Sequence, residues 1–170
     1  MLYKSDKPYP KVRIEAKNKT YANRLLQNFS GIVSEETAIH LYLYQAISSS
    51  DNFLEYKEIM YHIAEVEMHH LRILGELIYK LGGRPIYGEY TSDCVFKNWS
   101  SNYINYTDSL KKRLLLDIAS EKQAIKNYEQ TISFIKDQFI EEILKRIIED
   151  EFIHIKIFEE LYHKYFGESS

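Results

Sequence analysis

Two Glu-x-x-His motifs alternate with two single glutamates along this chain, and this order constrains its fold more than any other feature. Each motif and each single glutamate falls within its own helix-like segment. A four-helix bundle that turns such residues inward gathers carboxylate and imidazole groups in its core, where they can enclose two metal ions. The order therefore predicts a bundle with a dinuclear metal site. The six candidate ligands are Glu35, Glu67, His70, Glu121, Glu151 and His154.

Helical periodicity indicates that three of these glutamates face the core. Residues three, four and seven positions apart share one face of a helix. At these spacings from Glu67, Glu121 and Glu151 the chain carries mainly Ile, Leu, Ala, Phe and Tyr, without Lys or Arg. Burying an uncompensated carboxylate is costly. Four carboxylates beside two neutral imidazoles would carry four negative charges, which two divalent cations neutralise.

The candidate ligand of the first helix is ambiguous between Glu35 and Glu36. The apolar stripe of this helix is centred on Glu36. A weak internal repeat indicates Glu35 instead, because Glu35 and Glu121 are each followed by Ala after three residues and by Tyr after seven. We favour Glu35 on this match. The two tyrosines, Tyr42 and Tyr128, are candidate catalytic residues that contact the ligands, although a structural place in the core is as common for tyrosines at such positions.

The ligand types narrow the choice of metal. Oxygen and imidazole ligands without thiolate suit iron or manganese better than structural zinc. In the simplest assignment Glu67 and Glu151 bridge the two ions, and the other four residues are terminal ligands. Such ions lie ~3.5–4 Å apart, a spacing suited to a substrate of two oxygen atoms. Asp150 could accept a proton from the outer nitrogen of a ligand histidine and so fix its tautomer.

Apolar stripes and capping residues predict one domain of four helices within the 170 residues. The helices are expected at about 20–48, 52–81, 107–136 and 138–166, after an irregular lead-in over 1–19. The connection between the second and third helices is long, whereas the other connections are short. This pattern is typical of an all-α, ferritin-like four-helix bundle with one long crossover connection.

Composition and charge argue against several classes of partner. A net charge of −3 gives no reason to expect nucleic acid or a membrane surface. The N-terminus lacks the apolar run of a signal peptide, and no stretch approaches the ~18 apolar residues of a membrane span, so we expect a cytoplasmic protein. Cys94 is the single cysteine, which excludes a Cys-x-x-Cys centre. Surplus apolar residues near Leu43 and Ile47 predict a homodimer.

Four segments around the candidate ligands resemble the rubrerythrin-type branch of the ferritin-like superfamily. They are SEETAIHLYLYQ (34–45), AEVEMHHLRILGELIYKLGG (64–83), ASEKQAIKNYEQ (119–130) and IIEDEFIHIKIFEEL (147–161). The resemblance implies a di-iron site with the six residues as ligands, and reduction of peroxide or dioxygen as the activity. Two departures matter. With a single cysteine no rubredoxin-like module is expected, so electrons would come from a separate donor. Ala124 also stands where rubrerythrins proper carry a further acidic ligand.

Three functions are compatible with these observations. The leading hypothesis is a di-iron oxidoreductase that reduces peroxide or dioxygen. The alternative is a manganese catalase-like enzyme that disproportionates peroxide on the same cage and needs no electron donor. The third is a non-catalytic bundle, either metal-binding or purely structural. Metal identity separates the first two hypotheses, whereas a protein that binds no metal would leave only the structural bundle.

Overall fold

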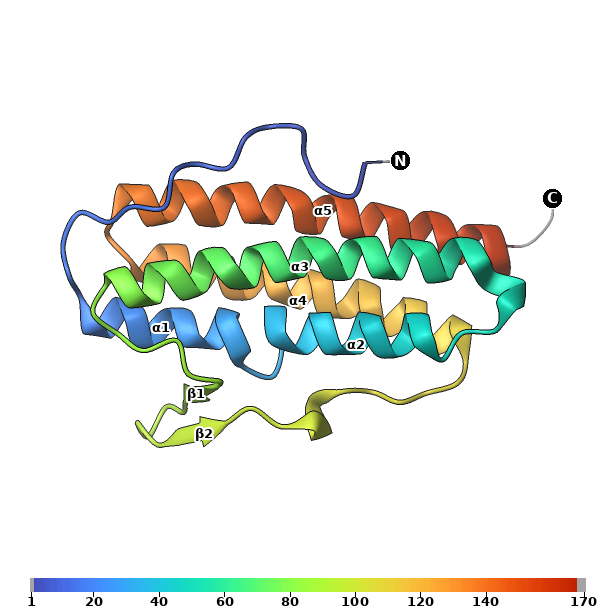
Figure 1. Cartoon of the computed structure of the whole chain (residues 1–170), viewed down its shortest axis with the longest axis horizontal. Coiled ribbons are helices and arrows are strands. Elements are labelled where there is room, and N and C mark those ends of the chain that lie inside the picture. Colours follow the sequence, from blue (N-terminus) through green and yellow to red (C-terminus); the bar gives the residue numbers. More distant parts are fainter. Residues whose placement is uncertain (1, 168–170) are drawn as a thin grey trace.

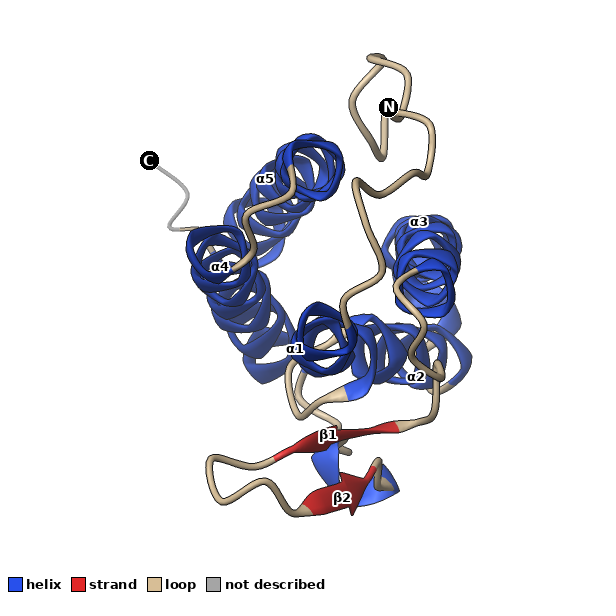
Figure 2. Cartoon of the chain, turned by 90° about the vertical axis from the view of Figure 1, so that its left-hand side faces the viewer, coloured by secondary structure: helices blue, strands red, loops and turns tan. Residues whose placement is uncertain are grey.

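The computed structural model describes residues 2–167, which fold into long helices lying side by side (Figure 1). These residues form the helices α1 (Lys19–Ser30), α2 (Glu35–Ile47), α3 (Leu54–Lys80), α4 (Leu110–Phe134) and α5 (Gln138–Phe166), the short 3₁₀ turns η1 (Asp51–Phe53) and η2 (Ser101–Tyr103), and the strands β1 (Gly88–Tyr90) and β2 (Phe96–Asn98). Seen from one end, α3, α4 and α5 form three sides of the bundle, and α1 and α2 together form the fourth (Figure 2).

The predicted single helix over about 20–48 is wrong, because the chain is interrupted between α1 and α2. The backbone N–H of Gly31 ends α1 by donating to the carbonyl of Gln27 at 3.0 Å. Glycine is required there, since a Cβ atom would lie 2.6 Å from that carbonyl oxygen. Ser34 then caps α2, and its side chain accepts a backbone N–H of the first turn. Glu35 is therefore the first residue of a helix, and helical phase does not carry over from α1.

The remaining helices lie within the other three predicted ranges, and side-chain caps explain where two of them begin. Helix α4 begins after Ser109, whose hydroxyl accepts the N–H of Lys112. Helix α5 begins after Asp137, which is its N-cap. The Asp137 carboxylate accepts the N–H groups of Phe139 and Ile140 at 3.0 and 3.2 Å.

The long connection between α3 and α4 contains an antiparallel β-hairpin that the sequence did not predict. Strands β1 and β2 pair with Gly88 opposite Asn98, and Figure 2 shows the hairpin outside the bundle, beside α1 and α2. The hydroxyl of Ser30 accepts the N–H of Gly88 at 2.7 Å and donates to its carbonyl at 3.1 Å. Gly88 has a φ of +154°, and a Cβ atom there would lie 2.2 Å from the Lys97 carbonyl oxygen. The hairpin is thus fixed to the end of α1.

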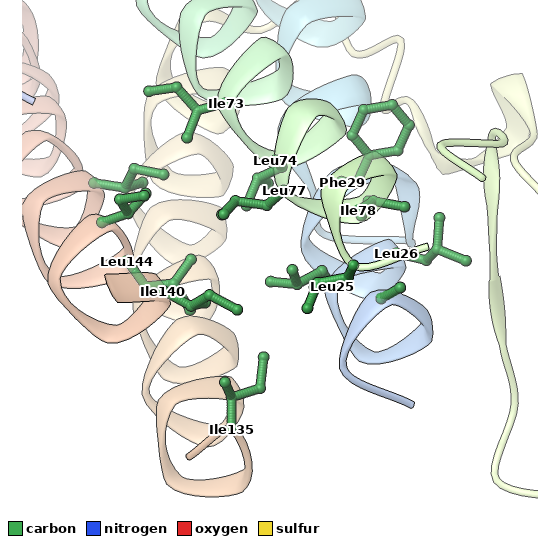
Figure 3. Packing of buried hydrophobic residues seen from close by; sticks show 14 of the residues in the cluster. Leu25, Leu26, Phe29, Ile73, Leu74, Leu77, Ile78, Ile135, Ile140 and Leu144 are labelled. Atoms are coloured by element: carbon green, nitrogen blue, oxygen red, sulfur yellow. The ribbon is translucent and has the colours of Figure 1, made fainter. Parts of the chain in front are cut away.

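Two apolar clusters fill the bundle on either side of a polar middle layer. The first joins α1 to the C-terminal half of α3 and the N-terminal half of α5, and Figure 3 shows part of its packing. The second joins α2 to the opposite halves of α3 and α5. Along α3 the two clusters leave Glu67 and His70 between them, and along α5 they leave Glu151 and His154.

An N-terminal strap (Leu2–Asn18) precedes α1 and runs along the outside of the bundle beside α3 and α5 (Figures 1 and 2). It has no regular secondary structure, in agreement with the predicted irregular lead-in. Within residues 2–167, the structure contains no helix that is both long and apolar enough to span a membrane. Ile47 is exposed on α2, and the homodimer that it suggests stays a prediction.

Candidate metal centre

The six candidate ligands meet in the polar middle layer of the bundle. They form two overlapping groups, in each of which one ligand atom per residue lies within 4.8 Å of the others. Glu67 and Glu151 belong to both groups. All six residues are buried, and none is more than 4% exposed. The first group is Glu35, Glu67, His70 and Glu151, and the second is Glu67, Glu121, Glu151 and His154.

The distances show how the two shared carboxylates are placed. Nδ1 of His70 lies 2.9 Å from Oε2 of Glu67 and 3.4 Å from Oε1 of Glu151. Nδ1 of His154 lies 3.0 Å from the other oxygen of each, Oε1 of Glu67 and Oε2 of Glu151. Each shared carboxylate therefore turns one oxygen to each histidine. The single glutamates lie farther out, with Glu35 3.6 Å from His70 and Glu121 3.8 Å from His154.

Three donor atoms of the centre lack the partner that a cation would supply. Oε1 of Glu67, Oε2 of Glu151 and Nδ1 of His154 are buried and have no hydrogen-bond partner. The 3.0 Å contacts among them lack hydrogen-bond geometry. Buried polar atoms are nearly always satisfied in proteins. These atoms, with four carboxylates and two imidazoles around them, form a dinuclear metal-binding site.

The pKa shifts of the single glutamates and of the two histidines reflect burial together with the negative charge of the centre. Burial raises the pKa of Glu35 and of Glu121 well above the usual range, and the two shared glutamates raise them further. Burial alone would lower the pKa of both histidines, but neighbouring carboxylates outweigh it and raise both pKa values well above the usual one. Glu151, Asp150 and Glu35 act on His70, and Glu67 and Glu151 act on His154. Without metal, protons on these groups compensate the carboxylates, so metal binding must displace them.

The predicted tyrosines contact ligands, and they do so crosswise between two helices. The hydroxyl of Tyr42 on α2 donates to Glu121 on α4. The hydroxyl of Tyr128 on α4 donates to Glu35 on α2. Burial raises the pKa of Tyr42 well above its usual value, and the negative charge of Glu121 adds to this. Tyr42 therefore stays a hydrogen-bond donor to its ligand partner.

The structure separates Glu35 from its neighbour. Glu36 lies outside both groups and contacts His40 at 2.9 Å near the surface. The apolar stripe pointed to Glu36 because it was counted across the interruption between α1 and α2. The position of Glu35 agrees with the repeat, and its assignment as a ligand stays a proposal.

Asp150 lies on the outer side of His70, with Oδ2 at 3.0 Å from Nε2. It is fully buried and also accepts from Arg146 at 2.6 Å. The Asp150 contact agrees with the predicted hydrogen bond to a ligand histidine. Arg146 was missed, although its position four residues before Asp150 on one helix was a usable signal. Tyr9, which donates to Asp150 at 2.5 Å, left no signal because it is 141 residues away in sequence.

A small cavity adjoins the centre between α2 and α4. Its volume of about 20 Å³ corresponds to roughly one water-sized molecule. Ala38 and Ala124, each three residues after a single glutamate, line it together with the two tyrosines. A small oxidant fits this space, whereas a bulky organic molecule does not.

The helical bundle and its paired carboxylate–histidine groups define a dinuclear metal protein with a ferritin-like fold. Residues 29–162 match the family described as rubrerythrin. Because the match spans most of the chain, the protein belongs to the rubrerythrin family.

Several proteins resemble the chain over most of its length. A probable manganese catalase from Clostridium acetobutylicum is 27% identical over 176 residues, which cover 94% of this chain and 77% of that protein. The crystal structure of wild-type KatB, a manganese catalase from Anabaena, has a TM-score of 0.81 at 23% identity and covers 98% of this chain and 82% of its own. The structure of Desulfovibrio desulfuricans bacterioferritin, described with a diiron site, has a TM-score of 0.70 at 23% identity. The match covers 90% of this chain and 88% of the bacterioferritin chain.

Proposed function

We propose that this protein is a dinuclear metal oxidoreductase whose substrate is peroxide, with dioxygen as the alternative oxidant. The observation that carries the proposal is the pair of shared carboxylates, each with one oxygen toward each histidine. Carboxylates placed in this way suit two ions ~3.5–4 Å apart. When bound, a pair of iron or manganese ions supplies the two electrons that cleavage of an O–O bond requires.

The protein's own groups would position the ligands and select the substrate. Glu35, Glu67 and His70 would hold one ion, and Glu121, Glu151 and His154 the other, with Glu67 and Glu151 shared. Tyr42 and Tyr128 restrain the single glutamates through their hydroxyl groups. The cavity beside Ala38 and Ala124 corresponds to roughly one water-sized molecule, so it favours a substrate of very few atoms. Burial of the whole centre keeps bulk water away from it.

Two forms of this activity differ in the metal and in the source of electrons. A di-iron peroxidase, supported by the rubrerythrin family, takes two electrons and two protons per peroxide from a separate donor and releases two waters. A manganese catalase turns two peroxides into two waters and one dioxygen without a donor. Similarity to manganese catalases supports the second form. Ala124, at a position where rubrerythrins proper carry an acidic ligand, also favours it.

Elemental analysis of protein purified without added metal tests the proposal first. We expect close to two ions of iron or manganese per chain. Addition of peroxide to the same protein then separates the two forms. Dioxygen release without a reductant indicates the catalase form, and peroxide loss only in the presence of a reductant indicates the peroxidase form. Absence of metal, with no uptake of ferrous or manganous ion under anaerobic conditions, would refute the proposal and leave a structural bundle.

A further inference from the structure

The N-terminal strap reaches both candidate ligand histidines from outside the bundle. Nε2 of His154 lies 3.0 Å from the backbone carbonyl oxygen of Tyr3. Nε2 of His70 lies 3.2 Å from the hydroxyl of Tyr9 and 3.0 Å from Asp150. A carbonyl and a carboxylate can only accept hydrogen bonds. Each Nε2 therefore carries a proton, and Nδ1, which faces the carboxylates of the centre, is the nitrogen available to a metal ion.

The strap also fixes Asp150. The N–H of Ser5 donates to Oδ1 at 2.7 Å, and the hydroxyl of Tyr9 donates to Oδ2 at 2.5 Å. Arg146 donates to Asp150 at 2.6 Å and to the carbonyl oxygens of Ser5 and Lys7, both at 2.9 Å. Its guanidinium also lies 4.2 Å from the centre of the Tyr9 ring. The orientation of a fully buried carboxylate thus depends on a segment without regular secondary structure.

We propose that the N-terminal strap determines how tightly the centre retains its two ions, with Tyr9 as a positioning residue for the ion at His70 and the Tyr3 carbonyl for the ion at His154. The inference rests on the proposed dinuclear function. The strap ends before residue 29, where the match to the rubrerythrin family begins. It therefore adds to the centre a set of contacts that the matched family segment does not contain.

The expected size of the effect on metal retention follows from the usual contribution of groups that hydrogen-bond to a metal ligand. Loss of a hydrogen-bond partner of a ligand histidine typically reduces metal affinity ~10–100-fold. Removal of the Tyr9 hydroxyl leaves Asp150 without the donor that orients its Oδ2 atom toward His70. Removal of the Tyr3 carbonyl leaves Nε2 of His154 without an acceptor. The two changes act on different histidines, so each is expected to loosen a different ion.

The test is the rate at which manganous ion leaves the loaded protein for an excess of chelator, followed as ions per chain. We expect Tyr9→Phe to accelerate the loss of one of the two ions by ~10-fold or more. Deletion of Leu2, Tyr3 and Lys4 should accelerate the loss of the other ion. The protein with both changes should release both ions rapidly.

Tyr56→Phe is the matched control. Tyr56 is a fully buried tyrosine that, like the half-buried Tyr9, donates a hydrogen bond, but its partner is Gln45 at 2.6 Å, away from the histidines. We expect this variant to release both ions at the wild-type rate. Equal rates in wild type, Tyr9→Phe and the shortened chain would refute the strap proposal, as would equal acceleration by Tyr56→Phe.

The shortened chain keeps Ser5, Tyr9 and Arg146, the residues that donate to Asp150. It removes only the exposed Leu2 and Lys4 and the half-buried Tyr3. A protein that takes up no manganous ion would refute the proposed function together with the strap. A protein that binds two ions and releases them equally from all variants would refute only the strap.

Discussion

The two kinds of glutamate in the centre differ in how many ions they could serve. Glu67 and Glu151 each turn one oxygen to each histidine, so each is common to both groups. Glu35 and Glu121 belong to one group each. A change at a single glutamate should therefore affect one ion, whereas a change at a shared glutamate should affect both. Metal stoichiometry can distinguish these cases residue by residue.

Glu35→Gln and Glu36→Gln form a matched pair of adjacent changes. We expect Glu35→Gln to lower the metal content from two ions to one per chain, because one buried anionic ligand is lost. Glu36→Gln should keep two ions, since Glu36 contacts His40 near the surface. Elemental analysis after dialysis measures both. Retention of two ions by Glu35→Gln and loss by Glu36→Gln would reverse the assignment.

Asp117 gives a prediction on stability that is independent of the metal. It is fully buried, Oδ1 accepts from Gln45 at 2.8 Å, and Oδ2 has no partner. Burial raises the pKa of Asp117 to about 8, although Gln45 and Arg113 oppose the shift. The unfolded side chain titrates near ~4, so between these values the folded state binds more protons. The contribution of Asp117 to the free energy of unfolding therefore falls as pH rises.

Asp117→Asn removes this titration. Relative to that of the variant, we expect the free energy of unfolding of the wild type to fall by on the order of 1 kcal/mol for each unit of pH between about pH 5 and pH 8. Urea unfolding of both metal-free proteins across this range measures the difference. A constant difference at all pH values would show that Asp117 is ionised in the folded protein.

Among the elements of the fold, the sequence predicted the features that depend on residues close together within one helix. Glu67 and His70 are three residues apart on an apolar stripe, and that spacing alone places both in the core. The interruption at Gly31 was missed because the apolar pattern continues through it with little change. The hairpin was also missed, and the lead-in was predicted as irregular without its contacts to the bundle. Their contacts, such as that between Tyr9 and His70, join residues far apart in sequence and leave no periodic pattern.

The interruption between α1 and α2 has a consequence for the centre. The hydroxyl of Ser34 accepts the N–H of Thr37 at 3.3 Å and donates to the carbonyl of Gly31 at 2.8 Å. It thus fixes the first turn of α2, where Glu35 is the first residue. We expect Ser34→Ala to lower the free energy of unfolding by about 1 kcal/mol, the usual value of an N-cap. It should also weaken binding of the ion at Glu35.

Ser109→Ala is the control for this prediction. Ser109 caps α4 in the same way but lies three turns before Glu121. We expect a similar loss of stability by urea unfolding, with unchanged metal affinity by titration. Equal metal affinities in both variants would show that the first turn of α2 does not position Glu35.

For the whole molecule, the centre joins four helices through charge rather than through apolar contact. Helices α2, α3, α4 and α5 each contribute at least one candidate ligand between the two apolar clusters. With metal, the buried carboxylates hold the helices together. Without it, burial and the shared glutamates disfavour ionisation of Glu35 and Glu121, as the raised pKa values of both show. We therefore expect the interactions that stabilise the bundle to differ between its metal-loaded and metal-free states.

Glu121→Gln should change stability in opposite directions in these two states. In the metal-free protein it replaces a buried carboxyl group whose ionisation burial and the shared glutamates disfavour, so the free energy of unfolding should stay equal or rise at neutral pH. In the metal-loaded protein it removes a ligand. Binding at 100 times the dissociation constant contributes ~2.7 kcal/mol per ion, and much of one such contribution should be lost.

Thermal unfolding of wild type and Glu121→Gln, each with and without manganous ion, measures the four stabilities. Glu160→Gln is the control, because Glu160 is exposed on α5 and should leave both states unchanged. A purely structural bundle predicts that Glu121→Gln has the same effect with and without metal, since no ion depends on the carboxylate. A reversal of sign between the two states would instead require that the buried carboxylates fold around their cations, so that metal binding and assembly of the four helices are one equilibrium.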